Sequence, residues 1–378
     1  MTSSRPTEPA RTRGWRIGTL AGAPVVVTAG WLLISVVLVA VIGPWLQRNL
    51  RLGIEAYLWA LTVPALLFVS VLAHELAHGL AARARGIRAR EYVITLWGGH
   101  TSFGTGLRSP ADSAIVSVAG PAANVLLAGI GWAAGMVTDG LPALAVLAFT
   151  YTNGFVAVFN LLPALPMDGG KLLEAAIWAV GKDRLRGMLV AGRAGQVLAI
   201  TVVVVSLGQP LLAGHRPSLT TAVWAVVVGV VLWNGAQASV RHAKAQMGAR
   251  GLDLRAMAAP VIGVDASATV ADLDALVAGT TATVVVTDQS RPVALVSADA
   301  WRAVPPPARG STPVTAVAAA LSPAAVVTVL AGPAAVARVA RAAQAGAAVV
   351  VLMDPVQGPL GVVPVADVVR RLGGNGRG

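Results

Sequence analysis

The chain has 378 residues, of which 56% are hydrophobic and only 12% are charged, with a mean hydropathy of +0.71. Soluble globular proteins carry about 25% charged residues, so this composition excludes an ordinary soluble domain and indicates a membrane protein. The absence of cysteine excludes disulfides and thiolate metal sites, and the net charge of +12 does not indicate nucleic-acid binding, because the arginines flank apolar runs.

The first 23 residues are polar and basic, and we expect them to form a cytoplasmic N-terminal tail. The apolar run that follows is too long for a signal-peptide core, so we interpret it as a retained span. Six runs are long enough to cross hydrocarbon, which predicts a membrane domain over 24–240. They lie near residues 24–46, 57–82, 112–137, 141–165, 188–213 and 219–238. The shorter segment 169–180 is expected to be a re-entrant or interfacial helix.

Basic residues are concentrated in alternate connections between the runs. They gather in the tail, in 83–110, in 166–187 and after the last run, whereas the intervening loops hold few. The positive-inside rule then places both termini in the cytoplasm.

The second run ends in "VLAHELAHGLAARARG", residues 71–86, which contains His74, Glu75 and His78. On a helix, residues four apart share a face, so both imidazoles can bind one Zn²⁺ while Glu75 acts as general base. His74 lies roughly 13 Å along the helix before Arg83, and so at some depth in the hydrocarbon. At that depth a buried cluster of ionisable side chains costs several kcal/mol unless the groups are paired or bind a metal. A structural cluster without metal is the alternative.

A catalytic zinc site needs a third protein ligand. The candidates are His100, His215, His242 and Asp168. Asp168 is favoured because it follows two helix-breaking prolines in "FNLLPALPMDGGKLL" (159–173). Backbone groups that lose their helical hydrogen bonds at membrane depth are tolerated only when they are buried in protein or line a wet cavity. An ordinary Asp-Gly turn at a helix exit is the alternative.

The segment "EYVITLWGGHTSFG" (91–104) alternates, turns at Gly98 and Gly99, and returns, which predicts a β-hairpin. Its edge could pair with an unwound substrate segment by strand addition. A plain cytoplasmic hairpin is the alternative.

From about Asp253 the chain changes to short β-branched strands and alanine-rich helices, a cytoplasmic α/β domain over 253–378. Residues 268–304 and 334–372 each follow the order helix, strand, turn, strand, helix, which indicates an internal duplication with repeats of about 253–305 and 313–374. "PPPARGSTP" between them is interpreted as a linker.

This order resembles a tandem pair of CBS domains, a resemblance that implies adenine-nucleotide binding and a homodimer. The residues that match the nucleotide motif in part are Ser297, Asp299 and Asp367, although Pro364 replaces a hydroxyl in the second copy. Nucleotide binding and a purely structural or dimerising role both stay open.

Across essentially the whole chain, the sequence resembles the site-2 protease family of intramembrane zinc metalloproteases, in the six-span, CBS-tailed form related to the sporulation protease that processes a sigma-factor precursor. Three motifs carry the resemblance: H-E-x-x-H at 74–78, N-x-x-P-x-x-x-x-D-G at 160–169, and G-P-x-x-N at 120–124. It implies that His74, His78 and Asp168 bind zinc, and that Glu75 is the general base. It also implies that Asn160 holds the substrate carbonyl or oxyanion, and that the hairpin with Gly98 and Gly99 lies beside the active site. For Gly120 and Asn124, close helix packing and a direct role at the active site are both open.

The expected fold is therefore a membrane α-helical domain of about six transmembrane helices with a membrane-associated β-hairpin, followed by a cytoplasmic α/β tandem CBS-like domain. The expected function is zinc-dependent hydrolysis of a peptide bond within or next to a transmembrane segment. The substrate would be a membrane-tethered regulatory protein, such as an anti-sigma factor or a sigma-factor precursor, and the site would lie in the cell membrane near its cytoplasmic face. A CBS-gated transporter or channel without protease activity is the competing hypothesis.

Overall fold

Helices form most of the first of two units, Met1–Val240 and Arg241–Gly378, into which the chain divides. The computed structural model describes residues 12–96, 98–104, 106–280 and 282–374. Six helices in it are long and apolar enough to cross a membrane, as the six runs predicted: α1 (Ala29–Asn49), α2 (Glu55–Ala84), α3 (Pro110–Gly135), α4 (Gly140–Asn160), α6 (Arg184–Leu212) and α7 (Leu219–Arg250). The chain is therefore a multi-pass membrane protein.

Helix α5 (Asp168–Gly181) has 14 residues, too few to span hydrocarbon, and occupies the place of the predicted interfacial helix. Three boundaries of the spans differ from prediction by five residues or more. Helix α1 begins at residue 29 because 23–27 form a strand, and α4 ends at residue 160, ahead of two prolines. Helix α7 continues to Arg250, where apolar character has already faded.

A four-stranded sheet accompanies these helices, with β1 (Trp15–Leu20), β2 (Ala23–Val27), β3 (Ala89–Thr95) and β4 (Gly98–Phe103) in that order. Strands β1 and β2 form one hairpin, β3 and β4 form the other, and β2 pairs with β3 in parallel. Within the predicted tail 1–23, residues 15–20 form β1, which pairs with β2, and β2 in turn pairs with β3, so this part of the tail belongs to the sheet. Residues 1–11 lie outside the described part of the chain. The predicted hairpin is present, but as half of a larger sheet whose edge strands are β1 and β4.

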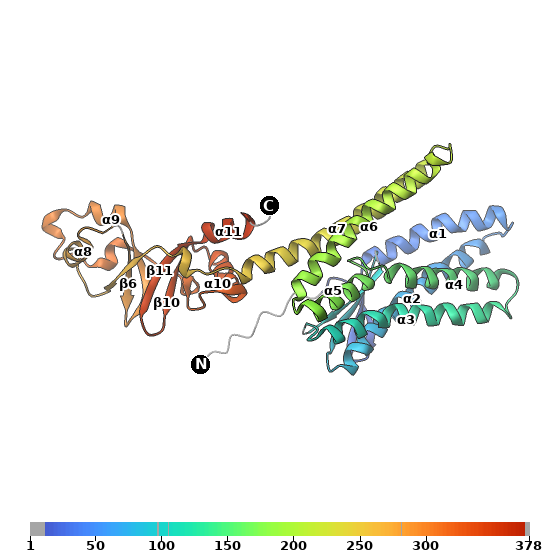
Figure 1. The fold of residues 1–378 in the computed structure, drawn as a ribbon, viewed down its shortest axis with the longest axis horizontal. Helices are drawn as coiled ribbons and strands as arrows, with labels where there is room; N and C mark the ends of the chain where they lie inside the picture. Colours follow the sequence, from blue (N-terminus) through green and yellow to red (C-terminus); the bar gives the residue numbers. More distant parts are fainter. Residues whose placement is uncertain (1–11, 97, 105, 281, 375–378) are drawn as a thin grey trace. The chain divides into compact units, whose positions relative to one another are not determined.

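Helix α2 lies at the centre of the membrane unit, packed against α1, α3, α4 and strands β3 and β4. Figure 1 shows α1 to α4 running alongside one another. The inner face of the sheet packs on the helices through a cluster of Val25, Trp31, Tyr92 and Ile94, with Leu72 and Leu76 of α2 against it. The segment of α2 that carries the histidines is thus enclosed by helices on one side and by the sheet on the other.

The second unit is built twice from the same parts. The first half contains β5 (Val261–Asp265), α8 (Val270–Val277), β6 (Thr283–Asp288), β7 (Arg291–Val296) and α9 (Ala298–Ala303). The second contains β9 (Val326–Val327), α10 (Gly332–Gln344), β10 (Val349–Asp354), β11 (Gly358–Pro364) and α11 (Val365–Gly374). In each half the first strand lies parallel to the second, which forms a hairpin with the third. The leading parallel strand is an addition to the order expected from sequence.

The segment between the halves is not a free linker. Arg309 binds both carboxylate oxygens of Asp274 on α8, at 3.0 and 2.9 Å, and Trp301 Nε1 donates to the same carboxylate at 2.8 Å. Strand β8 (Ala318–Ala320) then pairs with β7, so the first sheet takes its last strand from beyond residue 313. The first repeat therefore reaches past the predicted boundary at residue 305, because its sheet is completed from the far side of the proline-rich segment.

Candidate metal centre

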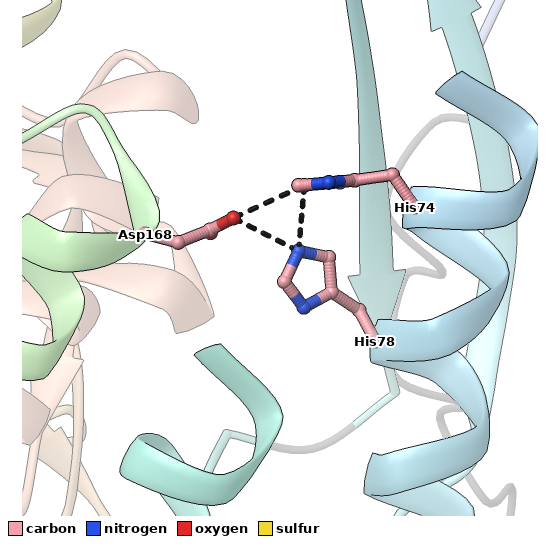
Figure 2. Close-up of side chains that lie close together, drawn as sticks. All are labelled: His74, His78 and Asp168. Carbon is pink, nitrogen blue, oxygen red and sulfur yellow. Dashed lines mark hydrogen bonds and ion pairs between the residues drawn. The ribbon is translucent and has the colours of Figure 1, made fainter. Parts of the chain in front are cut away.

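Two histidines of helix α2 face one carboxylate at the start of helix α5. His74 and His78 lie four residues apart, so their side chains leave the same face of the helix. Their Nε2 atoms are 3.1 Å apart, and each lies 3.1 Å from Oδ2 of Asp168. Figure 2 shows the three side chains pointing toward one another. Their exposed fractions are 7%, 5% and 4%, so this polar triangle lies in the interior of the membrane unit.

A second contact fixes how each imidazole is turned. Nδ1 of His74 lies 2.5 Å from Oδ1 of Asn124, and Nδ1 of His78 lies 2.6 Å from the backbone carbonyl of Val116. An oxygen acceptor at Nδ1 requires the proton on that nitrogen, which leaves the lone pair of Nε2 directed at Asp168. Helix α3 thus supplies the partner that orients each histidine.

Asp168 is held in place by the loop before it and by a cation after it. The loop crosses two prolines, and the backbone N–H of Leu165 within it donates to the carbonyl of Ala191 on α6 at 3.0 Å. Lys171 Nζ lies 2.9 Å from Oδ1 of Asp168, the oxygen that does not face the histidines. The two oxygens therefore have separate partners, and Oδ2 is free to act as a single ligand.

These three donor atoms fit zinc. Zinc takes nitrogen and oxygen donors at about 2.0–2.2 Å in a tetrahedral arrangement, which places neighbouring donors about 3.3 Å apart. The separations of 3.1 Å come close to this value. Among the described residues, His74, His78 and Asp168 are the one group of three such side chains near enough to hold a metal. Three protein ligands leave a fourth position for water or substrate, as in catalytic zinc sites.

A glycine keeps the space before the histidines open. A Cβ added at Gly120 of α3 would lie less than 3.0 Å from Nε2 of both His74 and His78, closer than real Cβ atoms come. Any side chain at this position would occupy the space that a metal needs. Gly120 of α3 therefore borders the site directly, and Asn124 lies behind His74.

Glu75 lies between the histidines and the sheet. It is 5% exposed, and the hydroxyl of Thr101 on β4 donates to its Oε2 at 2.7 Å. A Cβ at Gly99 would lie 2.5 Å from Cγ of Glu75, so only a glycine lets β4 approach this carboxylate. Gly98 precedes it at the hairpin turn with φ of +111°. The structure thus brings the predicted base and the predicted hairpin glycines together.

Two cavities meet at this site. One of about 470 Å³ has a mainly apolar wall from the spans, which includes Trp31, Leu67, Phe155, Phe159 and Leu232. The other, of about 670 Å³, carries polar side chains, which include His100, Ser117, Lys171, Glu174 and Arg184. Five residues line both: His74, Glu75, Gly99, Asn160 and Pro166. The carboxylate of Glu75 therefore has access to an apolar space and to a polar one.

Asn160, the last residue of α4, lies where the two cavities join. Its Nδ2 donates to the backbone carbonyl of Val156 at 3.1 Å, and its side chain is half-buried. It lines both cavities together with His74 and Glu75.

The other three histidines are not part of the triangle, although His100 lines the polar cavity. His100 is exposed on β4, His215 follows the end of α6, and Nε2 of His242 on α7 lies 3.0 Å from Nε2 of Gln246. The structure thus selects Asp168 from the candidates for the third donor.

Sequence reasoning missed four side chains near the site. Thr101 and Lys171 contact Glu75 and Asp168 directly, and Asn153 and Ser70 lie behind Asn124. Two had a signal in the sequence. Asn153 lies two helical turns before Asn160 and so on the same face, and Lys171 follows Asp168 by three residues.

Of the three residues of the nucleotide motif, Ser297 and Asp299 lie at the start of α9 in the first half, and Asp367 lies on α11 in the second half. Ser297 caps α9 by accepting from the N–H of Ala300, and the side chain of Asp299 is 97% exposed beside Arg302. Asp367 binds Arg370 at 2.8 Å and lines an open hollow of about 640 Å³. The described lining of that hollow includes neither Ser297 nor Asp299.

The family model described as Peptidase family M50 matches residues 62–146 and 137–205, which include the histidines, Glu75 and Asp168. A putative zinc metalloprotease of Synechocystis sp. is 32% identical over 233 residues, covering 61% of this chain and 60% of the relative. Stage IV sporulation protein FB of Bacillus subtilis is 29% identical over 140 residues, covering 34% of this chain and 48% of the relative. The chain thus spans less than two thirds of the length of these relatives.

The solved structure of a site-2 protease from Methanocaldococcus jannaschii aligns with a TM-score of 0.42 and 22% identity, over 60% of this chain and 95% of that one.

Proposed function

Through residues 62–205 the chain belongs to peptidase family M50, and from that membership we propose that it is an intramembrane zinc metalloendopeptidase of the site-2 protease type. The observation that carries the proposal is the triangle of His74, His78 and Asp168 with Glu75 beside it, enclosed by membrane-spanning helices. The family membership and the curated zinc metalloprotease relative favour this function over a gated transporter or channel.

Zinc would be held by Nε2 of both histidines and by Oδ2 of Asp168, and when bound it would polarise the scissile carbonyl and lower the pKa of water. Glu75 takes a proton from the attacking water and gives it to the leaving amine, a general base that becomes a general acid. Thr101 holds Oε2 of Glu75, so one oxygen of the carboxylate is fixed, and Glu75 lines both cavities.

Asn160 stabilises the developing oxyanion. One N–H of its carboxamide is bound to Val156, which orients the group, and the second can donate toward the junction of the two cavities. An oriented amide donor in a site of low dielectric is the kind of group that stabilises such charge.

The substrate is a membrane-tethered regulatory protein, for which an anti-sigma factor and a sigma-factor precursor are the two candidates. A transmembrane helix hides its peptide bonds, so the substrate must unwind before hydrolysis. Strand β4 has one strand neighbour, β3, and its Gly98 and Gly99 line the apolar cavity. Addition of the unwound segment to this edge would place it beside Glu75.

The distribution of arginine and lysine supports a topology with both termini in the cytoplasm and the site near the cytoplasmic face. The second unit is proposed to be a tandem CBS-like pair that regulates the protease. The two similar halves are consistent with a unit that binds an adenine nucleotide or forms a homodimer interface. Ser297, Asp299 and Asp367 are the candidate residues for binding the nucleotide.

Metal analysis of the purified full chain tests the proposal. We expect one zinc per chain in the wild type and in Glu75→Gln, because Glu75 is not a ligand. Absence of zinc from the wild type would overturn the proposed function.

A further inference from the structure

Behind His74, three buried polar side chains form a hydrogen-bonded row that crosses α3, α4 and α2. Asn124 Nδ2 donates to Oδ1 of Asn153 at 2.8 Å, and Asn153 Nδ2 donates to the hydroxyl of Ser70 at 2.9 Å. The exposed fractions are 0% for both asparagines and 2% for the serine. Polar side chains within spans are costly, so a row of three requires a role.

Backbone carbonyls fix the far end of this row. Nδ2 of Asn153 also donates to the carbonyl of Phe149 at 2.9 Å, and the hydroxyl of Ser70 donates to the carbonyl of Leu66 at 2.9 Å. A carbonyl can only accept. The amide group of Asn153 that meets Phe149 must therefore be its NH₂, because the reverse orientation would set two oxygens against each other.

This constraint passes along the row to the histidine. Since the NH₂ of Asn153 is fixed at Phe149, its oxygen faces Asn124, which must present its own NH₂ there. The oxygen of Asn124 then faces Nδ1 of His74, which must carry the proton. Only one orientation of each group satisfies every donor and acceptor.

We propose that Asn153 is a positioning residue that sets the tautomer of His74, so that Nε2 presents its lone pair to the zinc site; the inference rests on the proposed function. His78 needs no such row, because its Nδ1 meets the carbonyl of Val116 directly. The orientation of His74 depends instead on two amides that could each turn. The carbonyl of Phe149 on α4 prevents them from turning.

Three substitutions separate this role from packing. Asn153→Leu keeps the approximate shape but removes the acceptor for Asn124. Ser70→Ala removes one partner of Asn153 but leaves its hydrogen bond to the carbonyl of Phe149. The direction of donation along the row is therefore unchanged. Thr150→Val on the same helix is the matched control, because Thr150 only donates to the carbonyl of Val146.

The first readout is zinc affinity, measured by competition with a chromophoric chelator on the metal-free full chain in detergent. Loss of a group that orients a metal ligand typically weakens binding by about 10–100-fold, which is the expected effect of Asn153→Leu. Ser70→Ala is expected to have little effect and Thr150→Val none. If Asn153→Leu does not fold, Asn153→Ser tests the same point, since a short hydroxyl cannot reach Asn124.

The second readout is the protonated nitrogen of His74 in metal-free protein labelled with ¹⁵N-histidine. The chain has five histidines, and His74 is assigned by its absence in His74→Gln. The wild type is expected to carry the proton on Nδ1 and Asn153→Leu to show a mixture of tautomers. Unchanged affinity and an unchanged spectrum in Asn153→Leu would overturn the inference, as would an equal loss of affinity in Ser70→Ala. A wild type that binds no zinc would instead overturn the proposed function.

Discussion

The hydroxyl of Thr101 donates to Oε2 of Glu75 at 2.7 Å, so the strand with a free edge beside the site also holds the proposed base. Substrate that adds to β4 would thus lie against the strand that orients the carboxylate. Binding and proton transfer share one structural element.

Thr101→Val should lower the rate of substrate cleavage and leave zinc content unchanged. The loss of one hydrogen bond to a charged carboxylate costs about 1.5–3 kcal/mol, which corresponds to about 10–150-fold in rate. Thr101→Ser keeps a hydroxyl and should restore most of the activity. Full activity of Thr101→Val would show that the strand does not orient Glu75.

Gly120→Ala should abolish zinc binding, because its Cβ would lie within 3.0 Å of both histidine Nε2 atoms. Gly129→Ala on the same helix is the matched control, since a Cβ there meets no atom within 4 Å. Metal analysis of the two purified variants decides the point. Equal zinc content in both would mean that Gly120 does not border the metal position.

Asp168→Asn should lower zinc occupancy and activity together. An amide oxygen is a weaker ligand than a carboxylate, and Lys171 would lose its ion pair with Oδ1. Asp139→Asn, an exposed aspartate at the start of α4, is the control and should retain zinc. Normal occupancy in Asp168→Asn would remove this residue from the ligand set.

Asp274→Ala should release the segment between the two halves of the second unit. Arg309 and Trp301 both bind the Asp274 carboxylate, so its loss frees the proline-rich segment for proteolysis. Limited trypsin digestion of the full chain should show cleavage after Arg309 about tenfold faster than in the wild type, as expected for about 1.4 kcal/mol of lost local stability. Asp299→Ala, whose carboxylate is almost fully exposed, should leave this rate unchanged.

The metal centre was largely predictable because the spacing of its residues along the chain indicates which side chains can meet. His74 and His78 share a helix face at four residues apart, and the prolines before Asp168 mark a broken helix. Burial of ionisable groups in hydrocarbon made an accidental cluster improbable. The six spans followed from the length of the apolar runs alone.

The sheet and the row behind His74 were not predictable in the same way. Ala23–Val27 continues the apolar run of α1, and a short apolar stretch cannot be assigned to strand or helix by hydropathy. Its strand form depends on pairing with β3, about 65 residues later. The contact between Asn153 and Asn124 joins two helices, so no local pattern signals it.

The most direct test of the proposed function compares new protein termini in membranes of cells that express either the wild type or Glu75→Gln. The account predicts fragments of membrane proteins cut within or next to a transmembrane segment, present with the wild type and absent with Glu75→Gln, which still binds zinc. Identical sets of fragments in both cells would contradict it.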